Sequence, residues 1–335
     1  MRMKFSKHMN NDLNKQEFLS LCYHYVRPEK TLDKFPRILG LTLKEFEEHV
    51  KTLQKKYEII SLEDIKKFIQ KKSNFSKVGM LFTFDDGLSD HFEAAKILHK
   101  HGIKGVFYIP TCILFDEPAN PNIIHYCLAN YGVKKFVLEY NQLIKKFNLN
   151  EELKIFFDSK NTDVWKTIKE IKNRFKYELD YINSRKILLT IYKKTLLRDF
   201  PNAMEIIHLT KEKIMKMLEM GHSIGVHTHT HISVAPSKLT RKEFEKEIVF
   251  PKKILEKEFS ITVDSLSYPF GEKQDCFSSS ELLKKTNQYK IAFTVETILN
   301  TTTKSSFGFG RYQPLSTDSI EDINEILDKM VNESK

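Results

Sequence analysis

The stretch GMLFTFDDG, residues 79–87, sets the fold class of this 335-residue chain. A short apolar run ends at two aspartates and a glycine, which is typical of a buried strand whose carboxyl end carries polar groups. Residues 89–101 then have apolar side chains at helical spacing and stop at Gly102. KGVFYI, residues 104–109, predicts a second buried strand. This strand–helix–strand order predicts parallel strands joined by a right-handed crossover.

The same alternation continues on both sides of this stretch. Thr42 with Glu45 and Thr240 with Glu243 are capping boxes that open helices, and Pro251 is expected to kink or split the second helix. The other expected strands are 19–26, 57–60, 222–226, 264–268 and 289–295, and the expected helices include 42–56, 62–70 and 210–221. The pattern as a whole predicts an α/β fold.

Residues 115–200 interrupt the alternation. This stretch is rich in Lys, Phe and Asn and shows helical periodicity without a clear strand, and it contains 16 Lys and Arg against 11 Asp and Glu. Without it the chain has about the length of a (β/α) barrel. We therefore expect a helical insertion within a single domain that spans residues 1–335.

Composition and charge narrow the class of protein. The hydrophobic fraction of 41% and the charged fraction of 29% are those of a globular chain and argue against disorder. The excess of 54 Lys and Arg over 44 Asp and Glu favours polyanionic partners, with a general lysine-rich bias as the alternative. The scattered cysteines, Cys22, Cys112, Cys127 and Cys276, form no Cys-x-x-Cys pair, which argues against a thiolate zinc site or a disulfide framework.

The first residues, MRMKFSKHMNNDLNKQEF, contain no apolar core of a secretory signal, and no apolar run approaches the roughly 18 residues of a membrane span. An intracellular protein is expected.

A second segment, GHSIGVHTHTH at residues 221–231, adds histidines to the two aspartates. His227 and His231 are four residues apart, so on a helical turn their imidazoles point the same way and can bind one cation. With Asp86 they form a set of two histidines and one carboxylate that leaves positions open for water and substrate. For the two aspartates the alternative is a turn with an N-cap aspartate, and for the histidines it is a solvated surface cluster.

A third segment, SYPFG at residues 267–271, follows another expected strand. A turn of this kind can present backbone N–H groups and an aromatic face to a sugar, although Pro-x-Gly turns are common.

The three segments, in this order, resemble the motifs of the NodB-homology polysaccharide deacetylases. TFDDG resembles the first motif of that family, HTHTH its histidine motif and SYPFG a variant of its Arg-x-Pro-Tyr motif, while LCYHYVRP with Tyr23 and His24 resembles its early Tyr-His segment. The resemblance runs from about Leu21 to about Arg311 and excludes the insertion.

This resemblance implies a distorted (β/α) barrel with one divalent metal ion, zinc as the first choice, at its mouth. Asp86, His227 and His231 would bind the metal ion, and Asp85 would be the general base. The backbone N–H of Phe270 would stabilise the oxyanion, and Tyr268 and Phe270 would contact the substrate.

Two residues of the family pattern are missing from this sequence, and other residues would have to take their roles. Ser267 stands where the family has its motif arginine. We hypothesise that Arg311, in the strand-like GFGRYQP, brings its guanidinium to the Asp85 carboxylate, and the alternative is an ordinary arginine at the barrel end that pairs with a surface acid. The late Leu-x-His segment that supplies the general acid has no match after Arg311. His24 is the candidate substitute, and a histidine packed against backbone is the alternative.

The predicted function is removal of an N-acetyl group from an amino sugar in intracellular glycan or lipopolysaccharide assembly. A cytoplasmic enzyme, peripheral to the inner face of the membrane, would act on a nucleotide-linked or lipid-linked sugar, with the basic insertion holding a diphosphate or the membrane surface. The alternatives are a deformylase or cyclic amide hydrolase of the same fold, and a non-catalytic carbohydrate-binding barrel. Nucleic acid is not expected as a partner, since no nucleic-acid-binding motif is present.

Overall fold

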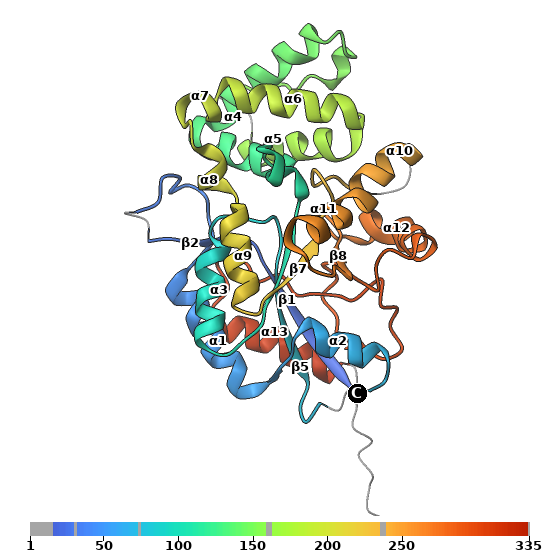
Figure 1. Cartoon of the computed structure of the whole chain (residues 1–335). Coiled ribbons are helices and arrows are strands. Elements are labelled where there is room, and N and C mark those ends of the chain that lie inside the picture. Colours follow the sequence, from blue (N-terminus) through green and yellow to red (C-terminus); the bar gives the residue numbers. More distant parts are fainter. Residues whose placement is uncertain (1–15, 30–31, 73–74, 159–162, 235–238, 334–335) are drawn as a thin grey trace, which may run out of the picture.

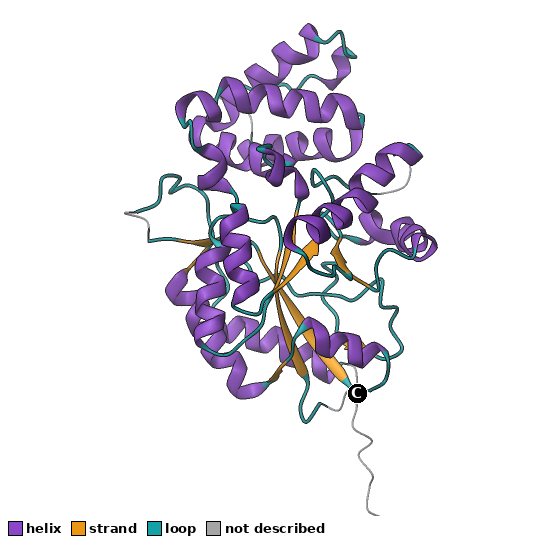
Figure 2. Cartoon of the chain, viewed as in Figure 1, coloured by secondary structure: helices purple, strands orange, loops and turns teal. Residues whose placement is uncertain are grey.

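The computed structural model describes residues 16–29, 32–72, 75–158, 163–234 and 239–333. It contains a curled, mainly parallel sheet surrounded by helices, with a further group of helices over one end of the sheet (Figures 1 and 2). The strands are β1 (Glu17–Tyr23), β2 (Val26–Arg27), β3 (Leu41–Thr42), β4 (Glu58–Ile59), β5 (Gly79–Phe84), β6 (Val106–Ile109), β7 (Ser223–Val226), β8 (Ser265–Ser267), β9 (Ile291–Phe293) and β10 (Asn300–Thr301).

The main sheet has the order β10-β1-β5-β6-β7-β8-β9, and every neighbouring pair except β10 with β1 is parallel. The extended segment 309–312 joins the two sides of this sheet: Phe309 bridges to Phe293 of β9, and Tyr312 bridges to Leu21 of β1. Backbone hydrogen bonds of 2.8–3.1 Å accompany both bridges. The strands therefore close into a ring, and the predicted distorted (β/α) barrel is confirmed.

Side chains alternate between the two faces of this ring, as the period of two residues in a strand requires. In β5, Phe82 and Phe84 pack into the main core beneath the helices, whereas Leu81 belongs to the core inside the ring. Toward the carboxyl ends of the strands the alternating positions are small or polar: Cys22, Thr83, Gly225, Ser265 and Ser267. A Cβ atom on Gly225 would lie 2.3 Å from the Tyr108 ring. This crowded but polar end of the interior is where the candidate site lies.

The helices that cover the barrel are α1 (Leu43–Lys56), α2 (Leu62–Ile69), α3 (His91–Lys100), α9 (Lys211–Glu219), α10 (Arg241–Phe244), α11 (Phe250–Phe259), α12 (Lys273–Thr286) and α13 (Ile320–Asn332). Thr42 and Thr240 form the predicted capping boxes of α1 and α10. Between α10 and α11 the chain makes a π-helical turn, Glu245–Val249, and Pro251 lies in the first turn of α11. Proline is tolerated there because the N–H groups of a first turn have no partner within the helix.

The chain between β6 and β7 forms the helices over the carboxyl end of the barrel (Figure 1). They are α4 (Asn120–Lys146, interrupted at Gly132), α5 (Val164–Asn173), α6 (Tyr181–Lys194), α7 (Leu196–Asp199) and α8 (Ala203–Ile207), with short 3-10 turns at Thr111–Phe115 and Glu151–Leu153 and a π-helical turn at Arg174–Glu178. A separate hydrophobic core holds them together. The segment expected at 115–200 is thus helical, while its status as an insertion in one domain of residues 1–335 stays a prediction.

One predicted strand was wrong in its extent. Residues 19–26 do not form a single strand, because β1 ends at Tyr23 and β2 begins only at Val26. The partner strand β5 ends at Phe84, opposite Tyr23, so the ladder has no partner beyond that point. The consequence is that His24 lies in a break at the carboxyl end of the barrel.

Within the residues that the structure describes, none of the helices combines the length and the hydrophobicity of a membrane span. The prediction about a secretory signal falls on residues 1–15, outside the described residues.

Candidate active site

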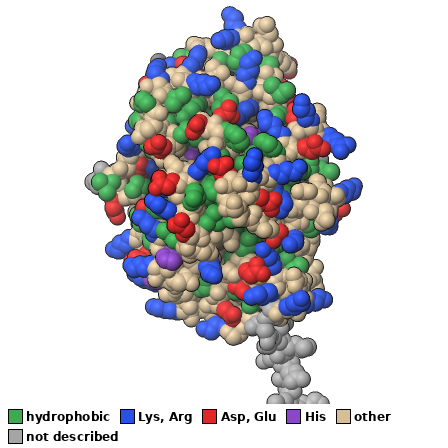
Figure 3. Space-filling view, in the orientation of Figure 1, with side chains coloured by type: hydrophobic (Ala, Val, Ile, Leu, Met, Phe, Trp, Pro, Cys, Tyr) green, Lys and Arg blue, Asp and Glu red, His purple; other side chains and the backbone are tan. Residues whose placement is uncertain are grey.

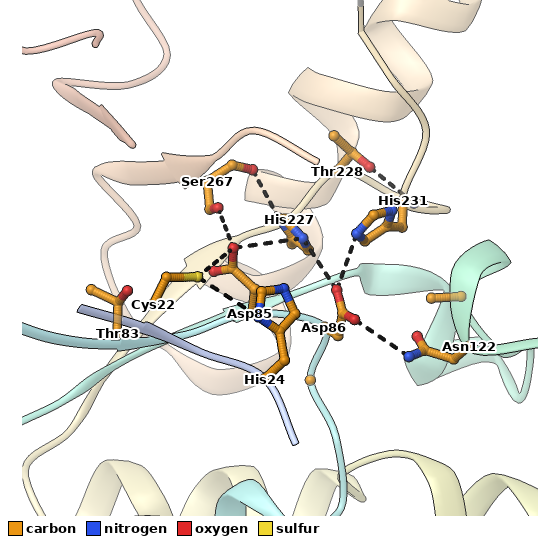
Figure 4. A network of polar contacts seen from close by, with 12 residues as sticks. Cys22, His24, Thr83, Asp85, Asp86, Asn122, His227, Thr228, His231 and Ser267 are labelled. Carbon is orange, nitrogen blue, oxygen red and sulfur yellow. Dashed lines mark hydrogen bonds and ion pairs between the residues drawn. The ribbon is translucent and has the colours of Figure 1, made fainter. Parts of the chain in front are cut away.

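Two carboxylates at the end of β5 form the centre of the site (Figure 4). Asp85 and Asp86 are 2% and 3% exposed, so both charges need compensation within the protein. Asp86 has a left-handed backbone with φ of 80°, and Gly87 follows with φ of 57°. This turn places the two adjacent side chains in different surroundings, which is consistent with different roles.

The guanidinium of Arg311 compensates the negative charge of Asp85. Its Nη1 and Nη2 donate to the two carboxylate oxygens at 2.8 and 2.6 Å, a bidentate geometry. Burial by itself raises the pKa of Asp85, but the Arg311 charge, with smaller contributions from His227 and His24, holds the pKa below its ordinary value. Arg311 is fully buried, with its guanidinium 5.7 Å from the centre of the Tyr108 ring. The contact hypothesised from the sequence is therefore present.

Ser267, at the position of the family's motif arginine, takes part in the same cluster. Its Oγ donates to Asp85 Oδ2 at 2.8 Å and accepts from Arg311 Nη2 at 2.7 Å. The small side chain leaves room for a guanidinium that arrives from the segment closing the barrel. The charge is therefore supplied from another strand.

Asp86, His227 and His231 converge beside this ion pair. Asp86 Oδ1 lies 3.3 Å from His227 Nε2 and 3.0 Å from His231 Nε2. His227 Nδ1 lies 2.9 Å from the backbone oxygen of Ser267, a contact that makes Nδ1 the donor and leaves the Nε2 lone pair free. Asp86 Oδ1 and His227 Nε2 are buried without a hydrogen-bond partner among the described residues. Three converging ligand atoms, two of them buried without a hydrogen-bond partner, fit a divalent cation.

The two histidines do not lie on a helical turn, and that expectation was wrong. Residues 227–231 form an irregular loop after β7, with left-handed backbone at Thr228 and His231, both at φ of 60°. Such conformations cost about 1–3 kcal/mol each and persist only where surrounding contacts enforce them. Here the loop carbonyls of residues 228–230 accept from the backbone N–H groups of residues 111, 112 and 120.

A buried glutamate that the sequence did not suggest holds the same loop. Glu247, on the π-helical turn before α11, is fully buried and accepts from the backbone N–H groups of His229 and Thr230 at 3.0 and 2.8 Å. Its other oxygen accepts from the Thr230 hydroxyl at 2.8 Å and the Tyr181 hydroxyl at 2.7 Å. Glu247 thus fixes the segment between the two candidate metal ligands.

A second unsuspected contact reaches the candidate metal carboxylate from the helices above. Asn122 of α4 donates through Nδ2 to Asp86 Oδ2 at 3.4 Å and to the Tyr25 hydroxyl at 3.2 Å. Tyr25 Oη lies 3.0 Å from His125 Nδ1. Residues between β6 and β7 therefore help to orient Asp86. No motif in the sequence indicated this.

The SYPFG segment follows β8 as expected. Phe270 has a left-handed backbone with φ of 64°, unusual for an aromatic residue, and its N–H has no hydrogen-bond partner among the described residues. Its ring packs edge-on against His231 at 5.0 Å between centroids. Tyr268 is buried and donates its hydroxyl to the Phe307 backbone oxygen at 3.1 Å, so that hydroxyl already has a partner.

His24 lies at the edge of the site. Its Nδ1 is 4.0 Å from Cys22 Sγ, its backbone oxygen lies 2.8 Å from His91 Nε2, and burial lowers its pKa. Cys22 donates to Asp85 Oδ2 at 3.4 Å. The structure therefore brings His24 near Asp85, and its imidazole makes no hydrogen bond to the backbone of the described residues.

A pocket of about 370 Å³ opens onto these residues. Its floor includes His24, the two aspartates and the two candidate metal histidines, and residues from α4, α5, α6 and the π-helical turn at Arg174–Glu178 form another wall. The volume is that of a small-ligand site. The helical segment between β6 and β7 thus helps to enclose the site.

Comparisons with known proteins show what this chain resembles. A sequence profile of the family described as polysaccharide deacetylase matches residues 156–293, which include the two histidines and SYPFG but not TFDDG. Among curated proteins the sequence has no match.

Solved structures show the same fold. Streptococcus pyogenes deacetylase PplD, solved in complex with acetate, is 15% identical with a TM-score of 0.58 over 93% of this chain and 98% of its own. IcaB from Ammonifex degensii is 14% identical, with a TM-score of 0.52 over 93% and 97%. A putative polysaccharide deacetylase from Bacillus anthracis is 17% identical, with a TM-score of 0.54 over 93% and 69%. The resemblance is confirmed to this extent: residues 156–293 match the polysaccharide deacetylase family, and the chain shares the fold of these solved structures.

Proposed function

We propose that this protein is a metal-dependent hydrolase that removes the N-acetyl group from an amino sugar. The observation that carries the proposal is the pairing of a buried Asp85–Arg311 ion pair with a buried Asp86, His227 and His231 cluster at one end of a pocket. A divalent ion held by that cluster, zinc in the first instance, would polarise the amide carbonyl and make water a stronger nucleophile.

Asp85 would take the proton from the attacking water through a carboxylate oxygen. Its bidentate contact with Arg311 keeps it ionised at neutral pH and fixes its orientation. The free N–H of Phe270 would donate to the oxygen that becomes negative in the tetrahedral intermediate, where one such donor contributes about 3–4 kcal/mol. His24 would deliver a proton to the leaving amine, because it lines the pocket beside Asp85.

The acetyl group is supported by similar structures that are described as deacetylases, one of them solved with acetate, and a saccharide substrate is supported by the match to the polysaccharide deacetylase family. A pocket of about 370 Å³ that is partly walled by helices suits one sugar with a nucleotide or lipid phosphate better than the middle of a long polymer. We therefore favour a nucleotide-linked or lipid-linked substrate. An intracellular location stays a prediction.

Contact with a membrane surface is part of this proposal. Trp165, the single tryptophan of the chain, is 75% exposed at the start of α5, next to the exposed Val164 and Lys166. An exposed aromatic residue among lysines is typical of an interfacial contact with anionic lipid. Vesicles that contain phosphatidylserine should shift Trp165 emission to shorter wavelength, whereas vesicles of phosphatidylcholine should not. An unchanged spectrum with both would reject the contact.

Over the face seen in Figure 3, basic and acidic side chains are interspersed. This face therefore lacks the basic patch or stripe that is typical of a nucleic-acid-binding surface.

Two alternatives to a deacetylase can be distinguished from it. A deformylase or cyclic amide hydrolase would use the same residues on a different acyl group. A non-catalytic carbohydrate-binding barrel was favoured by the loss of the motif arginine, and the contact of Arg311 with Asp85 weakens that argument.

The experiment measures acetate and formate release from acylated amino sugars, together with metal content by elemental analysis. Wild-type protein should release acetate and bind about one divalent ion per chain, His227→Ala should lose the ion, and Asp85→Asn should keep it while losing hydrolysis. His99→Ala is a control, since His99 lies at the exposed end of α3 and contacts the Met220 backbone. Undiminished metal in His227→Ala or near-normal turnover by Asp85→Asn would refute these assignments.

A further inference from the structure

The pocket wall formed by the helices above the barrel contains two lysines, and they differ in their surroundings. Lys176, on the π-helical turn after α5, lies 2.9 Å from Asp275 and 3.7 Å from Glu272, and its ammonium group stands 4.4 Å from the centre of the Phe270 ring. Its charge is therefore compensated by the protein itself.

Lys172, in the last turn of α5, lines the same pocket and makes no ion pair with any described residue. The residue is exposed overall, but it lines the pocket wall, where its partial burial lowers the pKa of its ammonium group. The neighbouring His125 cannot compensate a positive charge, because an imidazole is either neutral or positive. Burial and then the charge of Lys172 lower the pKa of His125 to about 3, so this imidazole is neutral at pH 7. Lys172 thus presents an uncompensated charge to the pocket.

The acidic residues that line the pocket are already engaged. Asp85 is paired with Arg311, Asp86 belongs to the candidate metal cluster, and Glu272 accepts from Gln274 at 2.7 Å and lies near Lys176. A neutral sugar would therefore leave Lys172 unpaired beside it. An anionic group on the substrate would gain a charge-assisted hydrogen bond.

We propose that Lys172 forms an anion subsite, and that the substrate is an N-acylated amino sugar carrying a phosphate or carboxylate group. This inference rests on the proposed function and deepens it, since it names the chemical class of the substrate and the residue that selects it. Lys172 acts in binding and specificity, while the chemistry stays with the barrel residues.

The test compares N-acetylglucosamine, N-acetylglucosamine 1-phosphate and N-acetylglucosaminuronic acid as substrates of the zinc-loaded protein. Wild-type protein should show a higher kcat/KM with one of the two anionic sugars than with the neutral sugar. The preferred anionic sugar identifies whether the charged group is a phosphate or a carboxylate. In Lys172→Met the preference for that anionic sugar over the neutral one should fall about tenfold, in line with the loss of one hydrogen bond to a charged group. Lys172→Arg should keep the preference, and Lys172→Glu should reverse it.

Lys145→Met is the matched control, because Lys145 is an exposed lysine at the end of α4 that does not line the pocket. It removes the same charge and should leave the preference unchanged. An equal fall in both variants would mean that net charge alone attracts the substrate, and no preference in wild-type protein would overturn the subsite.

Calorimetric titration of the sugar phosphate and of inorganic phosphate separates this inference from the proposed function. Tighter binding by wild-type protein than by Lys172→Met, without acetate release, would support the subsite and reject the deacetylase. Acetate release with equal preference for neutral and anionic sugars would support the deacetylase and reject the subsite. Equal or absent binding of both phosphates would also reject the subsite.

Discussion

Replacement of Glu247 by alanine should loosen the loop that carries His227 and His231, although Glu247 itself contacts neither imidazole. Its carboxylate accepts four hydrogen bonds: two from backbone N–H groups of the loop and two from hydroxyl groups. The two hydroxyls can rotate toward other acceptors, but the two backbone N–H groups cannot. A buried donor left without an acceptor costs about 1–3 kcal/mol, so these two groups alone imply a loss of about 2–6 kcal/mol.

Part of that loss should appear in metal affinity. Thr228 and His231 keep left-handed backbone conformations, and the bonds to Glu247 at residues 229 and 230 lie between them. If the loop relaxes, the two imidazoles no longer converge on Asp86 before the ion binds. A shift of about 1.4 kcal/mol corresponds to a tenfold weaker metal affinity.

The assay combines thermal unfolding, with and without added zinc, and competition for zinc with a chelating indicator. Glu247→Ala should unfold at lower temperature and bind zinc at least tenfold more weakly, whereas Glu247→Gln should fall in between, since an amide oxygen can still accept from the two N–H groups. Glu245→Ala is the matched control, because Glu245 lies on the same π-helical turn and its exposed carboxylate pairs only with exposed Arg241 among the described residues. Unchanged zinc affinity in Glu247→Ala would refute the reasoning.

Two further changes test the interior of the barrel and its pH dependence. Arg311→Lys keeps the positive charge but cannot reproduce the bidentate contact with Asp85, and a lost hydrogen bond to a charged group costs about 1.5–3 kcal/mol. Chemical denaturation should show this loss together with lower turnover, and unchanged values would contradict the assigned contact. His222 accepts from the Gly105 N–H and lies 2.9 Å from the Ala95 oxygen, and burial lowers its pKa to about 4. Between pH 6.5 and 4 the unfolded chain therefore binds a proton that the native chain does not, and stability falls as pH falls, by about 3 kcal/mol for this group. His222→Asn should be less stable at pH 7 but lose less stability over that window, and an identical pH profile would contradict the assignment.

Local sequence patterns determined much of this protein. The apolar run before Asp85 and Asp86 identified β5, because a strand that is buried on both faces is mostly apolar along its length. Thr42 and Thr240 marked helix starts, because a capping box needs only residues three apart. The hypothesis that Arg311 contacts Asp85 rested on its place in an apolar and glycine-rich segment, where a solvated arginine is less expected.

Other features depend on partners that are distant in the sequence, and only the tertiary structure decided them. The helical turn expected for His227 and His231 was wrong, because the loop backbone bonds to Glu247 and to residues 111, 112 and 120. The His231 N–H donates to the Thr228 hydroxyl and not to a backbone oxygen of the loop. Asn122 reaches Asp86 from a helix that carries no motif. Periodicity tells which face of an element is buried, but it does not tell which element that face meets. For this reason the sequence indicated the candidate metal ligands, while the groups that hold them and the wall that encloses them emerged only from the folded chain.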